Sequence, residues 1–69
     1  MNPELLLLED LMDTALVNGV LELMRDICNE KAYHLRSNWQ DDRTAQAWER
    51  AARALDRAAT HPAIVVVSR

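Results

Sequence analysis

Residues 41–59 read DDRTAQAWERAARALDRAA, and this stretch is typical of an amphipathic helix. Either of the two aspartates that open it can cap the first turn. Its apolar face carries Trp48 and Leu55 among small side chains, and seven of the ten alanines of the chain fall within it. Such small side chains let a neighbouring helix approach to about 8 Å. We therefore predict a helix over 41–60 that packs closely against another helix.

Two further helices are predicted before this one. Residues 2–4, Asn-Pro-Glu, are typical of a helix start, with a cap, a proline at the first helical position and an acid. Apolar residues then recur in steps of three and four over residues 17–27. The apolar faces of these two stretches point about 150° apart, so they do not fit one continuous helix. We expect a second helix over 14–37, with the break near Asp13-Thr14 or near Asn18-Gly19.

The predicted fold class is all-α: a short N-terminal helix, then an antiparallel hairpin of the helices at 14–37 and 41–60. These helices form one small domain over residues 1–61. The remaining residues, 62–69, contain four consecutive β-branched side chains, which favour an extended C-terminal tail or a short strand. An unpaired apolar strand edge is prone to aggregation, so we expect another surface to cover this tail.

Length and composition argue against an enzyme. A chain of 69 residues buries only a small core, and its one cysteine, Cys28, cannot form an internal disulfide. One cysteine and two histidines cannot supply the four ligands of a structural zinc site. A glycine-rich phosphate loop is excluded by a single glycine, and Glu30 with His34 is interpreted as a surface pair. We expect no catalytic residue, no cofactor and no metal.

The most informative feature is a run of four leucines at residues 5–8. Four consecutive positions cover every side of a helix, so one neighbouring helix cannot bury them all. We predict self-association, with a homodimer favoured and a tetramer left open. The residues predicted for self-association or partner binding are Leu5, Leu6, Leu7, Leu8, Leu11, Ile64, Val65, Val66 and Val67. Two acids follow this run directly, so it is much shorter than the 18 or so apolar residues that span a bilayer. We therefore expect a cytoplasmic protein without a membrane partner.

Charge is distributed unevenly along the chain, whose formal net charge is −3. Residues 1–30 carry seven acids and one base, whereas residues 31–69 carry seven bases and four acids, so the halves should attract each other. We expect Arg53 to pair with Glu49 and Asp56 on its own helix. A charged contact stripe is predicted on the outer face of that helix, formed by Arg43, Arg50, Arg53 and Arg57.

These observations favour a non-enzymatic interaction module: a regulator, adaptor or inhibitor that binds another protein, as a homodimer. The extended tail could add a strand to the sheet edge of such a partner. One alternative is a small nucleic-acid-binding regulator that uses the arginine stripe. Another is a structural subunit of a larger assembly.

Overall fold

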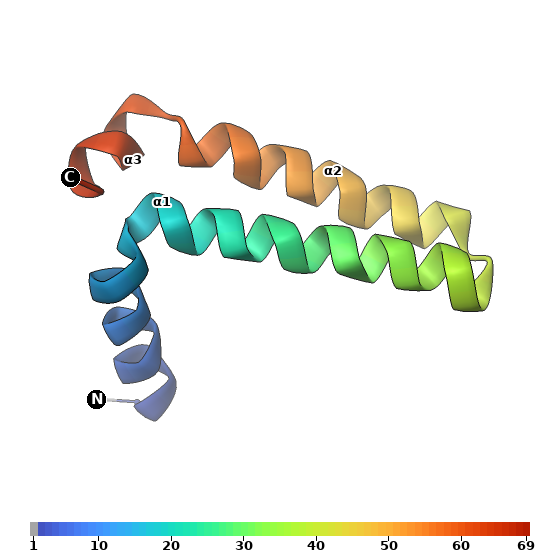
Figure 1. The fold of residues 1–69 in the computed structure, drawn as a ribbon, viewed down its shortest axis with the longest axis horizontal. Helices are drawn as coiled ribbons and strands as arrows, with labels where there is room; N and C mark the ends of the chain where they lie inside the picture. Colours follow the sequence, from blue (N-terminus) through green and yellow to red (C-terminus); the bar gives the residue numbers. More distant parts are fainter. Residues whose placement is uncertain (1) are drawn as a thin grey trace.

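The long first helix, α1 (Pro3–His34), begins where the sequence places a helix start. The structure is a computed structural model that describes residues 2–69 (Figure 1). Asn2 Oδ1 accepts a hydrogen bond from the Glu4 amide at 2.7 Å, and Pro3 occupies the first turn. α1 bends at Leu16, whose φ of 67° and ψ of 166° lie outside the helical region. We call residues 3–15 the arm and residues 17–34 the long part of α1.

The position of this bend corrects the sequence prediction. It lies at Leu16, between the two predicted sites at Asp13-Thr14 and Asn18-Gly19. The Thr14 hydroxyl donates to the Asp10 carbonyl at 2.9 Å, a bond within the arm, so Thr14 does not cap a new helix. Gly19 lies inside the helix and has no positive φ, so it does not act as a C-cap. A leucine at positive φ carries no signal in a sequence.

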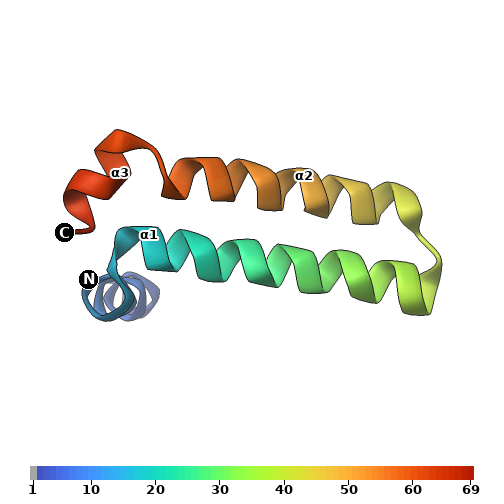
Figure 2. The same ribbon diagram turned by 45° about the horizontal axis from the view of Figure 1, so that its top comes forward.

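A π-helical turn, η1 (Leu35–Trp39), and the left-handed residue Gln40 (φ 52°) connect α1 to α2 (Asp42–Ala59). Asp41 caps α2, because its Oδ1 accepts from the Thr44 amide at 3.1 Å. The long part of α1 and α2 lie side by side and run in opposite directions (Figures 1 and 2). Residues 2–69 form helices and connecting turns without a strand, which confirms the all-α class.

The contact between these two helices is lined by small side chains. α2 buries three alanines at seven-residue spacing, Ala45, Ala52 and Ala59. α1 buries Val20, Cys28 and Ala32. Valine is the largest of these, so the bulky apolar side chains lie elsewhere.

The C-terminal residues correct a second prediction, because residues 62–67 form the helix α3 (Pro62–Val67) rather than an extended tail or strand. His61 Nδ1 accepts from the Ala63 amide at 3.1 Å, and Pro62 stands at the helix start, where proline is favourable. No strand among residues 2–69 is present to pair with this segment, so helix formation satisfies its backbone groups instead. β-branched residues prefer strands only where a neighbouring strand or face receives them.

Ser68 fastens α3 to the bend in α1. Its hydroxyl accepts from the Asn18 amide at 2.9 Å and donates to the Ile64 carbonyl at 2.7 Å. The bend at Leu16 starts a new helical segment, whose first amides have no partner within that segment. Ser68, only 6% exposed, satisfies one of these amides from the far end of the chain.

Candidate interaction surface

A single chain leaves far more surface exposed than a compact protein of its size. Its solvent-accessible surface is 5369 Å², whereas a folded monomer of 7.9 kDa exposes about 4,400 Å². Its radius of gyration is 14.1 Å, against about 11 Å for a compact domain of 69 residues. The bend at Leu16 contributes to this shape, because the arm leaves the paired helices at a large angle (Figure 1).

The arm carries the leucines that the sequence singles out, and all of them are exposed. Their exposed fractions range from 41% at Leu11 to 72% at Leu7. Every residue from 2 to 14 is exposed, so this segment gains little from tertiary packing. A helix of 13 residues is only marginally stable in water without such packing.

A second apolar surface lies along one side of the contact between α1 and α2. Lys31 Nζ of α1 lies 5.3 Å from the centre of the Trp48 ring of α2. This contact shows which residues of the two helices lie opposite each other on this side. Because the helices are antiparallel, the next heptad places Met24 of α1 opposite Leu55 of α2. We call this surface the apolar flank and define it as Leu23, Met24, Ile27, Trp48 and Leu55. Its three α1 members are each about half exposed.

Sequence reasoning missed the apolar flank as a separate surface. Met24 and Ile27 belong to the recurring apolar positions of residues 17–27, from which the sequence analysis predicts a helix but no exposed surface. The sequence signal for this surface was the width of the apolar face of residues 17–27. The buried residues of α2 are alanines, which cover only part of so wide a face.

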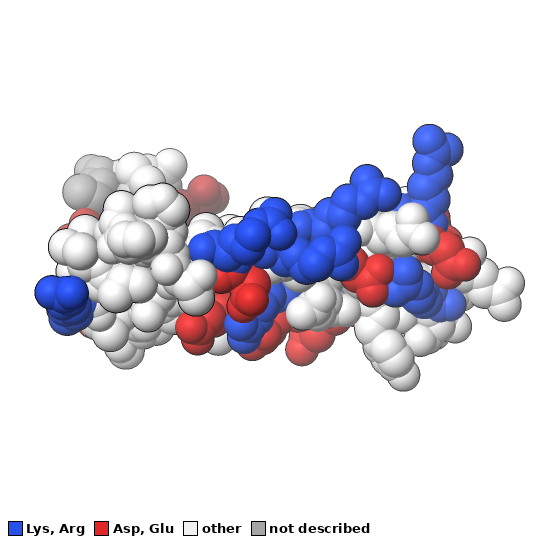
Figure 3. All heavy atoms as spheres, turned by 90° about the horizontal axis from the view of Figure 1, so that it is seen from above, with Lys and Arg blue, Asp and Glu red and all other residues white. Residues whose placement is uncertain are grey.

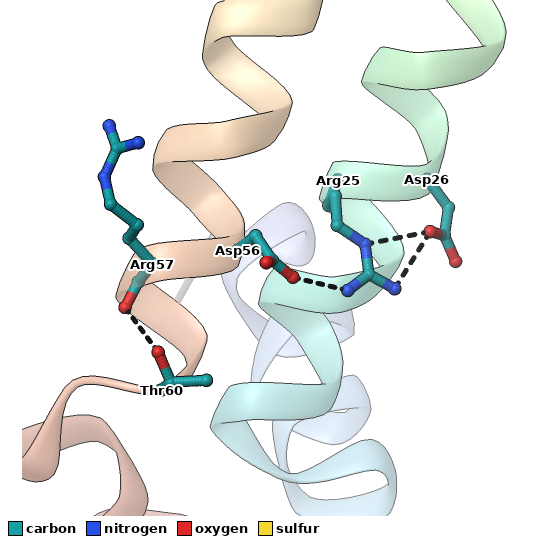
Figure 4. Close-up of polar contacts among 5 residues, drawn as sticks. All are labelled: Arg25, Asp26, Asp56, Arg57 and Thr60. Carbon is teal, nitrogen blue, oxygen red and sulfur yellow. Dashed lines mark hydrogen bonds and ion pairs between the residues drawn. The ribbon is translucent and has the colours of Figure 1, made fainter.

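The opposite side of the same contact is polar. Arg25 Nη1 lies 2.7 Å from Asp56 Oδ1, and Arg36 Nη1 lies 2.5 Å from Glu49 Oε2. Figure 4 shows Arg25 between Asp26 and Asp56, with Arg57 directed away from this cluster. The hydrogen bond from Arg36 lowers the pKa of the Glu49 carboxyl below its ordinary value.

These ion pairs correct the prediction that Arg53 pairs with Glu49 and Asp56. Asp56 binds Arg25 of α1, and Glu49 binds Arg36 of η1. The ion pair that joins the two halves of the sequence therefore links a base of α1, Arg25, to an acid of α2, Asp56, whereas the pair of Arg36 with Glu49 lies within residues 31–69. The excess acids of residues 1–30 and the excess bases of α2 stay at the surface.

The predicted arginine stripe on α2 is exposed at all four positions, Arg43, Arg50, Arg53 and Arg57. Seen from above, Figure 3 shows Lys and Arg side chains forming a ridge along the molecule. Within residues 2–69 the ion pairs of arginine are made by Arg25 and Arg36, so none of the four stripe arginines forms an ion pair with an acid among these residues, although Arg53 lies near enough to attract the Glu49 carboxylate.

The C-terminal residues predicted for partner binding lie on α3. Ile64 is partly buried, whereas Val65, Val66 and Val67 are exposed. The end of the molecule that holds α3 is mostly uncharged in Figure 3. These valines and the leucines of the arm therefore form separate apolar surfaces on different helices.

The candidate metal and nucleophile residues lie apart from one another. The side-chain amide of Asn38 is 2.8 Å from His34 Nδ1, so His34 has a different neighbour from the predicted Glu30. Cys28 is buried between the helices. In the part of the chain that the structure describes, no three histidine, cysteine or acidic side chains gather as metal ligands.

Comparisons with protein families, with curated proteins and with solved structures find no match for this chain. Over residues 2–69, none of the helices has the length and apolar character needed to cross a membrane.

Proposed function

We propose that this protein is a non-enzymatic helical interaction module that acts by binding another protein, and that it does so as a homodimer. The observation that carries the proposal is its exposed apolar surface. Among residues 2–69, fifteen large apolar side chains are exposed, whereas the buried core consists of small ones. Contiguous exposed apolar surface of this kind marks protein–protein contact sites in soluble proteins.

The proposed module has two apolar surfaces with separate roles. The leucines of the arm serve self-association, and the exposed valines of α3 bind the protein partner. Because residues 62–67 are helical, the partner meets a short helical surface, and strand addition to its sheet is not part of the proposal. Occupying the surface of another protein in this way is how a small regulator, adaptor or inhibitor acts.

The test is affinity capture with the full-length tagged chain from a lysate of its source organism, with and without nuclease. We expect a defined protein partner that survives nuclease and is lost with Val66→Asp. The matched control is Tyr33→Asp, because Tyr33 is also exposed but lies on α1. A partner retained equally by both variants, or the absence of a protein partner, would overturn the proposal.

A second candidate, a nucleic-acid-binding regulator, is favoured by the unpaired arginine stripe. Arg43 and Arg57 are 14 residues apart on α2, a distance of about 21 Å along the helix. Phosphate contacts by such a stripe predict binding to duplex DNA that weakens steeply between about 50 and 200 mM salt. The check is fluorescence anisotropy with wild type and Arg50→Gln. Absent or salt-independent binding would exclude this candidate.

A further inference from the structure

We propose that His61 makes α3 a pH-sensitive switch. A neutral imidazole keeps α3 folded beside the bend in α1, and protonation of the ring releases this helix. The functional consequence rests on the partner-binding role proposed above for the valines of α3, because release of α3 removes that surface. The inference follows from the cap at His61, from the few contacts that hold α3 and from the charges around the ring.

The hydrogen bond between His61 and α3 requires a neutral ring. Nδ1 of His61 accepts from the Ala63 amide at 3.1 Å. A backbone amide can only donate, so Nδ1 must carry a free lone pair and the ring proton must lie on Nε2. In an imidazolium both ring nitrogens are donors. Protonation of His61 therefore breaks this bond.

The same cap occurs at the start of α1 with a side chain that does not titrate. Asn2 precedes Pro3 as His61 precedes Pro62, and Asn2 Oδ1 accepts from the amide two residues on, that of Glu4, at 2.7 Å. The backbone angles φ and ψ are −60° and 133° at Asn2, and −62° and 136° at His61. His61→Asn should therefore cap α3 in the same way at every pH.

α3 depends on this cap because few other contacts hold it. A helix of six residues is too short to be stable by itself in water. Ile64 is partly buried, whereas the valines at 65–67 are exposed. Ser68 adds hydrogen bonds to the Asn18 amide and to the Ile64 carbonyl, beside the bend in α1 (Figures 1 and 2). Loss of the cap therefore favours opening of α3, which also withdraws Ser68 from Asn18.

The charges around His61 offer a protonated ring no acidic partner. Among the residues that the structure describes, no acid forms an ion pair with the ring. α3 is uncharged, and so is the stretch 14–21 of α1 that meets it. In the last turns of α2, Asp56 is held in an ion pair by α1, while Arg57 and the residue after α3, Arg69, are basic. A positive ring at a helix start also opposes the helix dipole.

A change from pH 7.5 to 5.5 addresses the histidines selectively. Histidine is the side chain that ordinarily changes charge in this range, and the chain has two, His34 and His61. Carboxylates ordinarily titrate near pH 4, so the ion pairs between the helices remain at pH 5.5. Opening of α3 in this range is therefore separate from the loss of those ion pairs at lower pH.

The test measures amide hydrogen exchange of the full-length chain by NMR at both pH values, with each rate divided by the intrinsic rate at that pH. The amides of Val65 and Asn18 report on α3, because they donate to the His61 carbonyl and to the Ser68 hydroxyl. We expect their protection to fall about fivefold at pH 5.5, the usual effect of losing a helix cap. The Cys28 amide, in the buried part of α1, is the reference and should keep its protection within twofold.

Two variants assign the effect to one ring. His61→Asn keeps an acceptor at the cap without a titrating group, so α3 should be protected equally at both pH values. His34→Gln removes the other imidazole and is the matched control, which should respond to pH as wild type does. Wild-type protection that is unchanged at pH 5.5, or that falls equally in His61→Asn, would overturn the switch.

Capture of the protein partner at the same two pH values tests the functional consequence. We expect wild type to lose the partner at pH 5.5 and His61→Asn to retain it. If wild type retains the partner while the exchange data show that α3 opens, the valines of α3 are not the partner surface, although the switch is present. If no partner is captured at either pH, the proposed function fails, and the exchange data alone decide the switch.

Discussion

At the scale of single residues, Ser68 connects the end of the chain to the bend in α1. Removing its hydroxyl leaves the Asn18 amide without an acceptor in a partly buried position. We expect Ser68→Ala to lower the free energy of unfolding by about 1 kcal/mol, the usual effect of losing a helix cap. Thermal or urea unfolding followed by circular dichroism measures this. Thr60→Ala is the control, because its exposed hydroxyl bonds only the Arg57 carbonyl (Figure 4), and it should unfold like wild type.

Gly19 provides a second prediction at this scale, in the opposite direction. It lies in a helical segment without a positive φ, and a Cβ there would lie 3.4 Å from the Ala15 Cβ, which is ordinary contact. Because glycine is a poor helix former, Gly19→Ala should raise the free energy of unfolding by about 0.5–1 kcal/mol. Urea unfolding of the two proteins side by side measures the difference. A destabilised variant would mean that the added methyl group does not fit against Ala15.

At the scale of elements, carboxylates of α2 bind Arg25 of α1 and Arg36 of η1, which makes the packing of α2 sensitive to acid. Hydrogen bonds from Arg36 lower the pKa of Glu49, and those from Thr44 lower the pKa of Asp41. A folded-state pKa below the unfolded value stabilises the protein at neutral pH, and this stabilisation is lost as pH falls through the folded pKa. The melting temperature of wild type should therefore drop below about pH 4.

Replacing Glu49 tests this assignment. Glu49→Gln should melt lower than wild type at pH 7, and the two should converge toward pH 3, since the wild-type carboxyl is then protonated. Glu22→Gln is the matched control, because Glu22 is exposed and outside the ion pairs of residues 2–69. A constant difference between Glu49→Gln and wild type across this range would show that the ion pair with Arg36 does not contribute.

The helices were predictable from the sequence to different degrees, for physical reasons. The caps at Asn2 and at Asp41 were predictable because capping residues are local sequence signals. The close packing of α2 was predictable from its alanine-rich face, whose alanines are buried. The helix α3 was mispredicted because a run of β-branched residues favours a strand only when a partner strand exists, which is a tertiary fact. The bend at Leu16 was misplaced because the helix that follows it is capped at the Asn18 amide by Ser68, 50 residues away, a contact that local periodicity does not reveal.

The candidate surfaces divide in the same way into those that local sequence signals predict and those that depend on tertiary contacts. Exposure of Leu5–Leu8 could be predicted because four consecutive apolar residues exceed what one helix contact covers. The apolar flank could not, since it exists only once α2 lies in one particular register against α1. Which acids Arg25 of α1 and Arg36 of η1 would bind depended on that register too.

At the scale of the whole molecule, stability should depend on protein concentration. An interface that forms only in the folded state stabilises that state by mass action, so its melting temperature rises with concentration. We expect an increase of a few degrees between about 1 and 300 µM, since about 1 kcal/mol shifts a domain of this size by roughly 4–8 °C. Scanning calorimetry or circular dichroism in short-path cells covers this range.

The arm distinguishes this effect from general association of apolar surface. Leu8→Asp places a charge on the arm face that would meet the partner, so its melting temperature should be independent of concentration. Tyr33→Asp changes an exposed residue away from the arm and should keep the wild-type dependence. If both variants respond to concentration as wild type does, the arm contributes nothing to the dimer. If wild type itself shows no dependence, the expanded shape with its 14.1 Å radius of gyration belongs to a monomer.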